Sequence, residues 1–371
     1  MKVDTKFSRR IFLQGKRMLD VLQPMHFSEP IDTVLANIQQ ALRSYLTKHK
    51  PRNPNPHKIV LVGGGSGSAV VGRSLLGAGI SHFTLIANVA DTLRDKETRQ
   101  PVGAGILKLG HSIPDVVDIT KQLLHTTPPG ARTKLHSFLE QKPVEAMRIG
   151  YLVLAALYRE LGSLQLAIQV LTEALGNSYE VLAGTEALTE LYLRDAERDG
   201  FLDLYTFAQH SAGPPAELKL EPPAEIAPAA KQSLLVAEYV IIGPGDLHFS
   251  VLPHFLVGGF SEALSSTAAT VTIVANLTTR PVDTPRFTLR RLLETYDRYL
   301  PQGKQCEVIV NHGSSHLPDA LTDDVLGENY GRFTLIRAMV ASDSKNNNKQ
   351  YVHDEAKLGA LLKRIIQGGH D

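Results

Sequence analysis

The stretch KIVLVGGGSGS, residues 58–68, joins a short apolar run to three consecutive glycines, and it decides the fold expected for this chain. Ile59 to Val62 predict a strand buried on both faces, and the apolar residues from Ala69 onward recur at helical spacing. The glycines therefore lie where a strand passes into a helix. A helix N-terminus has unpaired backbone N–H groups, and residues without a Cβ atom let an anion approach them closely. We expect a phosphate-binding turn made by Gly63, Gly64, Gly65, Ser66, Gly67 and Ser68.

The sequence of this turn differs from those of the two commonest nucleotide-binding loops. The dinucleotide pattern GxGxxG fails at Ser68 when it is counted from Gly63, and at Val70 when it is counted from Gly65. No acidic residue closes the second predicted strand, and no Lys-Ser or Lys-Thr pair follows the glycines. An NAD site and a Walker-type site are therefore disfavoured. The remaining alternative is a tight turn whose glycines only let the helix pack against the sheet.

Composition limits the partners that the chain can have. With 371 residues and 43% hydrophobic content, it can bury one large core or two smaller ones. Its 39 basic and 38 acidic residues give a formal net charge of +1, so no long-range field attracts nucleic acid or an acidic membrane. The single cysteine, Cys306, lies in an apolar run and is expected to be a strand residue in a reducing compartment.

The N-terminal region carries a motif that could suggest export. SRRIFLQG, residues 8–15, looks like a twin-arginine signal, but charged residues follow the arginines where a signal peptide needs an apolar stretch. No segment is long and apolar enough to span a bilayer, so we expect a cytoplasmic protein. Residues 1–56 are expected to form a helical extension with a proline-rich linker. An amphipathic helix at Phe7 to Leu22 leaves homo-oligomerisation open.

Residues 57–371 are expected to form the main α/β domain, with a helical insertion at about 113–176. Strand-like pieces follow at residues 179–182, 188–193 and 202–207, and residues 213–231 read as a proline-rich connection. Beyond them, helices and buried strands alternate again, as in a Rossmann-like, doubly wound and mostly parallel sheet.

A second glycine turn follows the buried strand predicted at residues 237–242. Gly243, Pro244 and Gly245 precede a helical pattern, so they form a second candidate site for an anion. The next strand, residues 270–275, ends in polar side chains, which the carboxyl edge of a parallel sheet would place near both turns. The polar side chains expected to contact a ligand at this edge are Asn88, Asn276, Thr279 and Arg280.

Histidines near these segments are weaker candidates for function. HGSSH, residues 312–316, places two histidines four residues apart, but no third ligand accompanies them and the composition is that of a loop. His248 could contact a phosphate, although a histidine near a helix start is more often a polar residue satisfied within the protein.

Four segments carry a resemblance to a known family: VGGGSGS, IIGPGDLHFSVLPHFLVGGFSEAL, ANLTTRPVDTPRFTLRRLLETYDRYL and YVHDEAKLGALL. They resemble the family that unites bacterial gluconeogenesis factors of the YvcK type with the 2-phospho-L-lactate transferases (CofD) of deazaflavin coenzyme synthesis. The similarity covers about Lys58 to Ile366. It implies a Rossmann-like fold that binds a nucleotide across the strand ends. The ligand is a UDP-sugar such as UDP-N-acetylglucosamine in one branch, and a guanylyl-linked phospholactate donor with a divalent metal in the other.

The segments that carry chemistry in the family are altered here. Where the family has an Asp-Asp-Gly-Gly-Ser run, this chain has ADTLRD, which keeps only Asp91. Where the family has Pro-Pro-Gly-Asp, this chain has HSIPD, which keeps Asp115. These two aspartates are the candidates for catalysis or for holding Mg²⁺, and capping a helix or turn is the structural alternative for each.

The resemblance thus implies two possible functions. The altered ADTLRD segment favours a non-catalytic, nucleotide-sugar-binding regulator of carbon metabolism and of the cell envelope and cell shape, similar to the gluconeogenesis factors. The alternative is a metal-dependent transferase of phosphorus-containing groups that acts on a nucleotide-linked donor and uses Mg²⁺. Apart from that ion, no cofactor is expected.

Overall fold

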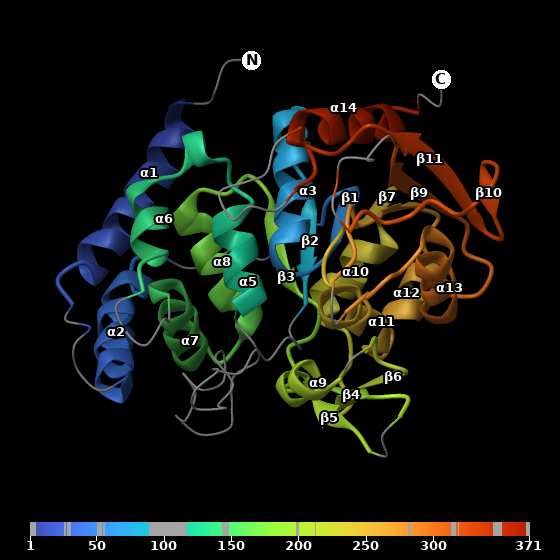
Figure 1. Cartoon of the computed structure of the whole chain (residues 1–371). Helices are drawn as coiled ribbons and strands as arrows, with labels where there is room; N and C mark the ends of the chain where they lie inside the picture. The colour runs from blue at the N-terminus through green and yellow to red at the C-terminus, as the bar shows by residue number, and fades with distance from the viewer. Residues whose placement is uncertain are drawn as a thin grey trace.

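The computed structural model describes residues 5–25, 27, 31–49, 54, 56–88, 117–142, 148–197, 200–211, 213–280, 283–312, 317, 319–343 and 351–368. In this part of the chain, an eight-stranded sheet forms the centre of the molecule (Figure 1). Its strand order is β10 (Asn329–Tyr330), β11 (Phe333–Ala338), β9 (Cys306–Asn311), β8 (Thr270–Val274), β7 (Tyr239–Ile242), β1 (Ile59–Gly63), β2 (Thr84–Ala87) and β3 (Glu180–Ala183). All neighbouring strands are parallel except β10 and β11.

The order of the strands reverses at β1, which places the two glycine turns side by side. From β1 the chain proceeds to β2 and β3 on one side, whereas β7, β8 and β9 continue on the other. Val62 pairs with Ile86 of β2 and with Ile242 of β7, so all three strands end at the same edge. Such a switch point is where open α/β sheets bind ligands. The prediction of a doubly wound, mostly parallel sheet is confirmed.

Helices cover both faces of the sheet (Figure 1). On one face lie α3 (Gly65–Gly77), α5 (Val117–His125) and α14 (Glu355–Ile366), whose buried side chains join those of a helical lobe. The lobe consists of α6 (Lys134–Leu139), α7 (Ile149–Leu161) and α8 (Leu164–Leu175), together with α1 (Thr5–Leu22) and α2 (Ile31–Leu46). On the other face lie α10 (Pro228–Leu235), α11 (Pro253–Leu256), α12 (Phe260–Ser266) and α13 (Leu289–Tyr299).

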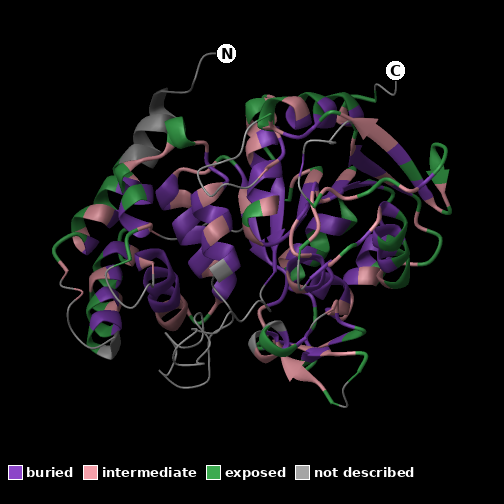
Figure 2. Ribbon diagram, in the orientation of Figure 1, coloured by how far each residue is buried: buried purple, intermediate pink, exposed green. Residues whose placement is uncertain are grey.

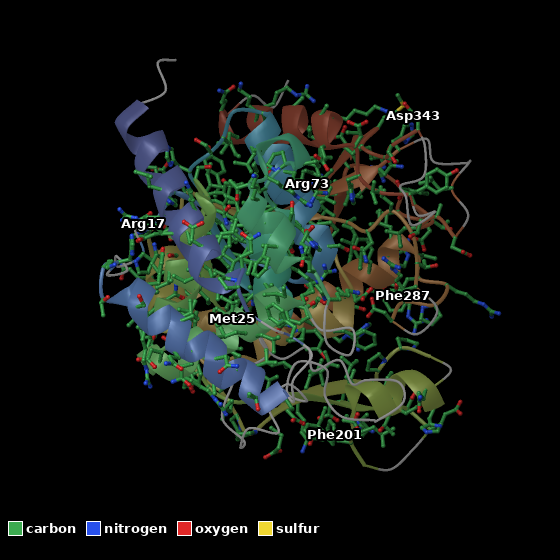
Figure 3. The ribbon with its side chains drawn as sticks, turned by 90° about the vertical axis from the view of Figure 1, so that its left-hand side faces the viewer. Arg17, Met25, Arg73, Phe201, Phe287 and Asp343 are labelled. Atoms are coloured by element: carbon green, nitrogen blue, oxygen red, sulfur yellow. The ribbon has the colours of Figure 1, made fainter. Side chains whose placement is uncertain are left out.

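The two N-terminal helices pack on the lobe through their apolar sides (Figures 2 and 3). Met18, Leu22, Ile38 and Leu42 are fully buried. A Cβ atom on Gly15 of α1 would lie 2.5 Å from the carbonyl oxygen of Ala174 in α8, so the two backbones are in close contact. Burial of these apolar side chains gives the helices most of their stability, because isolated helices of this length are marginal in water.

The segment between β3 and α10 differs from the sequence prediction in two places. The strand expected at residues 202–207 stops after β5 (Leu202–Asp203), because the Asp203 carboxylate accepts hydrogen bonds from the N–H (3.1 Å) and hydroxyl (2.6 Å) of Thr206 and so starts α9 (Leu204–His210). The proline-rich connection expected at residues 213–231 instead contains β6 (Glu217–Glu221), which pairs with β4 (Glu190–Arg194). Leu218 and Leu220 alternate with polar residues and are buried, a strand pattern that the surrounding prolines obscured.

Candidate functional site

The first glycine turn links the end of β1 to the start of α3. Gly65 has a φ of +62°, in the left-handed region that favours glycine, and Gly64 is the extended residue before the helix. No described side chain accepts a hydrogen bond from the N–H of Ser66 or Gly67, and both residues line an open pocket. The positive end of the α3 dipole therefore faces solvent with free donors.

The second glycine turn lies against the first through backbone atoms. A Cβ atom on Gly67 would collide with the carbonyl oxygen of Pro244, and one on Gly243 would lie 3.0 Å from the Ser68 hydroxyl oxygen. Ser68 is buried, and its hydroxyl donates to the Gly64 carbonyl oxygen at 3.3 Å. Its side chain therefore belongs to the packing between the turns, whereas the exposed Ser66 faces the pocket.

The second turn is held by two side chains of this chain. The Asn276 amide donates to the Gly245 carbonyl oxygen at 2.7 Å and accepts from the Gly245 N–H at 3.1 Å. The Asp283 carboxylate accepts from the N–H groups of Leu247 and His248 at 2.6 and 2.8 Å. The helical turn that follows Asp246 thus already has a negative charge at its N-terminus, supplied by the protein itself.

Asp283 also pairs with the ring of His248, and both side chains are buried. The Nδ1 atom of His248 lies 2.9 Å from the Asp283 carboxylate, and the ring meets Phe287 edge to face. His248 is therefore a partner of Asp283 inside the protein. Sequence reasoning missed Asp283, because nothing in its local sequence distinguishes it from other loop aspartates.

The other predicted polar residues lie in different positions relative to the pocket. Asn88 is 3% exposed, and its amide donates to the Phe249 carbonyl oxygen at 3.1 Å. The N–H of Thr279 donates to the Asp319 carbonyl oxygen at 2.8 Å. Arg280 does line the pocket, where its Nε lies 3.6 Å from the Asp246 carboxylate. Asp91, Asp115 and residues 313–316 lie outside the described residues.

The pocket has a volume of about 710 Å³ and lies over the N-terminal half of α3. Its floor is the first turn, and one wall is formed by the second turn and the end of β8. The opposite wall comes from the α5 end and the loop after it, and from the segment before α14. The lining residues are Gly64, Gly65, Ser66, Gly67, Ala69, Val70, Arg73, His125, Pro129, Arg132, Pro244, Gly245, Asp246, Ser250, Asn276, Leu277, Thr278, Arg280, Tyr351, Val352, His353 and Glu355.

Asp118, in the first turn of α5, lies next to the first glycine turn. It was not among the site residues predicted from the sequence. Its carboxylate is fully buried, and one oxygen accepts from Lys121 Nζ at 3.0 Å. The other oxygen has no hydrogen-bond partner among the described residues, and a Cβ atom on Gly64 would collide with it. An acid at the start of a predicted helix, three residues after Asp115, was the available signal.

A second carboxylate, that of Asp246, shares this electrostatic environment. Burial in the pocket wall raises the pKa of Asp246, and the Asp283 and Asp118 carboxylates raise it further, while Arg280 lowers it. Carboxylates near a phosphate-binding turn repel an anion unless a cation lies between them. A divalent cation would remove this repulsion. Asp246, which lines the pocket, and Asp118, which is buried beside Gly64, are the carboxylates that would hold it. Among the described residues, no group of three or more histidine, cysteine or acidic side chains offers a complete metal site.

None of the described helices has the length and apolar character needed to cross a bilayer.

Comparison with known proteins places the chain in a family. The sequence profile described as "2-phospho-L-lactate transferase CofD" matches residues 59–368. A Thermotoga maritima protein named "Putative gluconeogenesis factor" is 24% identical over 321 residues, which span 83% of this chain and 99% of that protein. A Halalkalibacterium halodurans protein named "Gluconeogenesis factor" is 25% identical over 308 residues, 82% of this chain and 86% of that protein.

Solved structures agree on the fold. A crystal structure of a Bacillus halodurans protein superposes with a TM-score of 0.70 at 18% identity, and covers 83% of this chain and all (100%) of its own. A second crystal structure of the same protein, described as a member of the UPF0052 family, gives a TM-score of 0.69 at 19% identity over 82% of this chain and 99% of its own. Because the profile match runs from β1 to beyond the end of α14, the chain belongs to the 2-phospho-L-lactate transferase CofD family.

Proposed function

We propose that the protein binds a nucleotide sugar, a UDP-sugar such as UDP-N-acetylglucosamine, with its diphosphate on the first glycine turn. The observation that carries this proposal is the contrast between the two helix starts. The N-terminus after the second turn is neutralised by Asp283, whereas the N-terminus of α3 has free N–H groups and opens into the pocket. A helix start of that kind binds phosphate.

The proposed role is regulatory. The name "gluconeogenesis factor" of the protein's relatives supports a role in carbon metabolism, and the proposal extends this role to the cell envelope and cell shape. In such a role the ligand reports the level of a metabolite, and the protein needs only to bind it. The volume of the pocket, about 710 Å³, supports the binding of a ligand of this kind, since it lies within the range of small-molecule and cofactor sites.

A thermal-shift screen with UDP-sugars, UDP, GDP and NAD, each with and without Mg²⁺, tests the proposal. A ligand that binds only the folded state raises the melting temperature. We expect a UDP-sugar to give the largest shift, and the absence of any shift with a nucleotide would overturn the proposal.

Gly65→Leu is the matching variant, because its side chain would extend into the pocket, with Asp118 Oδ1 at 4.0 Å as the nearest atom to its Cβ. Gly79→Leu is the control, since Gly79 also has a positive φ (+85°) and open space around it but does not line the pocket. Both variants carry a similar backbone strain of about 1–2 kcal/mol. We expect only Gly65→Leu to lose the ligand-induced shift.

The unpartnered carboxylate oxygen of Asp118 supports a second candidate, a metal-dependent transferase that uses a nucleotide-linked donor. A bound Mg²⁺ would neutralise phosphate oxygens during transfer. In that function Asp118 and Asp246 hold the ion, the first glycine turn orients the phosphates, and Arg280 balances the charge of Asp246. Stabilisation by a guanine nucleotide only in the presence of Mg²⁺ would favour the transferase over the UDP-sugar binder.

A further inference from the structure

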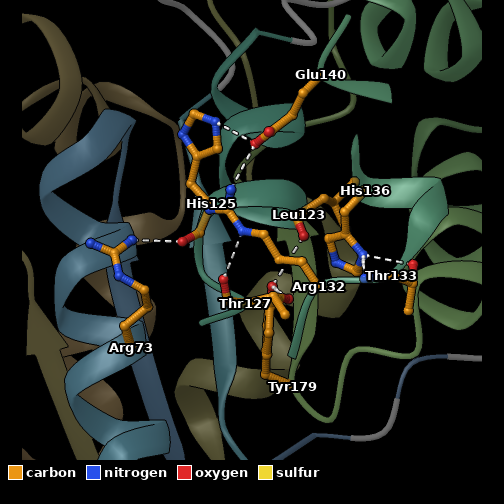
Figure 4. Close-up of polar contacts among 9 residues, drawn as sticks. All are labelled: Arg73, Leu123, His125, Thr127, Arg132, Thr133, His136, Glu140 and Tyr179. Atoms are coloured by element: carbon orange, nitrogen blue, oxygen red, sulfur yellow. Dashed lines mark hydrogen bonds and ion pairs between the residues drawn. The ribbon is translucent and has the colours of Figure 1, made fainter. Parts of the chain in front are cut away.

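The end of the pocket farthest from the glycine turns is lined by basic side chains. Arg73 lies eight residues after Gly65 on α3, which corresponds to about 12 Å along a helix axis. Long side chains on a helix lean back toward its N-terminus, so the Arg73 guanidinium lies nearer to the first turn than its Cα does. His125 and Arg132 also line the pocket, and Figure 4 shows the Arg73 guanidinium donating to the His125 carbonyl oxygen.

Each guanidinium group is held at two of its three nitrogens, Nε and Nη1. Arg73 Nε donates to Glu355 at 2.7 Å, and Nη1 donates to the His125 carbonyl oxygen at 2.6 Å. Arg132 Nε donates to the Thr127 carbonyl oxygen at 3.3 Å, and Nη1 donates to Glu140 at 3.2 Å (Figure 4). The Nη2 group of each arginine has no hydrogen-bond partner among the described residues. These contacts hold two oriented donors in place without using all of their capacity.

Four cations contribute to the electrostatic environment of His125, and each of the two pocket arginines is also paired with a glutamate. Burial, and after it the charges of Arg148, Arg132, Arg73 and Lys121, together lower the pKa of His125 to about 4, although Glu140 lies 3.3 Å from its ring. His125 is therefore neutral at pH 7 and adds no cation of its own. An anion that entered here would meet arginines whose side chains are only 17% and 25% exposed, where water screens charge less than at the surface.

We propose that Arg73 and Arg132 form a second anion subsite, which binds a carboxylate on the sugar of the nucleotide ligand. This inference rests on the proposed function, because it assumes that the diphosphate occupies the first glycine turn. Each Nη2 group still has donor hydrogens, so a carboxylate between the two arginines can accept one charge-assisted hydrogen bond from each. This narrows the ligand class of the proposed function: a nucleotide diphosphate linked to an acidic sugar is expected to bind in preference to one linked to a neutral sugar, N-acetylglucosamine included.

The test compares UDP-glucuronate with UDP-glucose, which differ only in a carboxylate replacing a hydroxymethyl group. Dissociation constants are measured by isothermal titration calorimetry on the full chain at fixed ionic strength and Mg²⁺ concentration. We expect UDP-glucuronate to bind about tenfold more tightly, as charge-assisted hydrogen bonds in a half-buried site allow. The readout for variants is the ratio of the two dissociation constants.

Arg132→Gln should bring the ratio of the two dissociation constants close to one. Arg132→Lys should reduce the preference only in part, because lysine keeps the positive charge but lacks the planar guanidinium donors. Arg148→Gln is the matched control: Arg148 contributes to the field at His125 but does not line the pocket, so its loss should leave the preference in place.

Equal binding of the two ligands by the native protein would overturn the subsite and leave the proposed function standing. Binding of neither ligand would overturn the subsite, and the thermal-shift screen with UDP-N-acetylglucosamine would then decide the proposed function separately. If Arg148→Gln loses the preference for UDP-glucuronate as completely as Arg132→Gln does, the preference arises from the summed positive charge of the region. That result would also overturn the subsite.

Discussion

Gly67 of the first glycine turn lies against the carbonyl group of Pro244 in the second, without room for a methyl group between them. The two turns come from β1 and β7, which are neighbours in the sheet although far apart in sequence. Their contact fixes the position of the α3 N-terminus relative to the wall formed by Pro244, Gly245 and Asp246. The geometry of the pocket therefore depends on this backbone contact.

Gly67→Ala should destabilise the protein by about 1–3 kcal/mol, because the new methyl group forces the turns apart. Gly77→Ala is the control on the same helix, since nothing lies within 4 Å of its Cβ position, and it should be neutral or stabilise by up to about 1 kcal/mol. Urea unfolding of both variants measures the difference. Equal stability of the two variants would contradict the close contact.

Asp283→Ala should lower the free energy of unfolding by about 2–4 kcal/mol, since it leaves two backbone N–H groups and the buried His248 ring without their acceptor. Asp283→Asn should cost less, because its amide oxygen can still accept. Asp343→Ala serves as a matched control: the Asp343 side chain is 90% exposed, and its ion pair with Lys357 should contribute less than about 1 kcal/mol. Denaturant unfolding compares the three variants, and a loss of similar size for Asp283→Ala and Asp343→Ala would contradict the role of Asp283.

Asp118→Asn should remove any dependence of nucleotide binding on Mg²⁺. The substitution takes away the charge that repels a phosphate and also the ligand that would hold the cation. The measurement is the ratio of nucleotide dissociation constants with and without Mg²⁺, which we expect to fall to about one. If the ratio in the variant matches that of the native protein, Asp118 does not hold the ion.

Stability should fall as the pH drops from 7 to 5. Burial lowers the pKa of His136, His254 and His353 to about 4, below the usual 6.5, so the unfolded chain takes up their protons first. Each of these histidines then lowers the free energy of unfolding at pH 5 by up to about 2 kcal/mol. Glu180 opposes this loss, because burial raises its pKa to about 7, and the folded state then binds its proton more tightly than the unfolded chain. The net loss expected at pH 5 is a few kcal/mol.

Urea unfolding at pH 7 and pH 5 measures this loss directly. His254→Phe keeps a ring beside Phe260, whose centroid lies 5.6 Å away, but cannot take up a proton. The difference in stability between the two pH values should therefore shrink by up to about 2 kcal/mol in this variant. An unchanged difference would show that His254 is not a source of the pH dependence.

The predicted fold was confirmed because its signals are local. The apolar run from Ile59 to Val62, the glycines after it and the helical spacing from Ala69 all lie within a few turns of one another. The same reasoning failed at residues 202–207, where the Asp203 cap overrode the strand pattern, and at β6, where prolines on both sides hid the alternation of Leu218 and Leu220.

By itself, the sequence determined that a strand passes through a glycine turn into a helix, since backbone conformation near glycines depends mainly on neighbouring residues. Only the tertiary structure decided which groups surround that junction. It places Asp118 beside Gly64, and it lets Asn276 and Asp283 hold the second turn. It also brings Arg73 and Arg132 into the lining of one pocket. The reason is physical: hydrogen bonds and charges between distant segments depend on how the elements pack, and the spacing of residues along the chain does not record that packing.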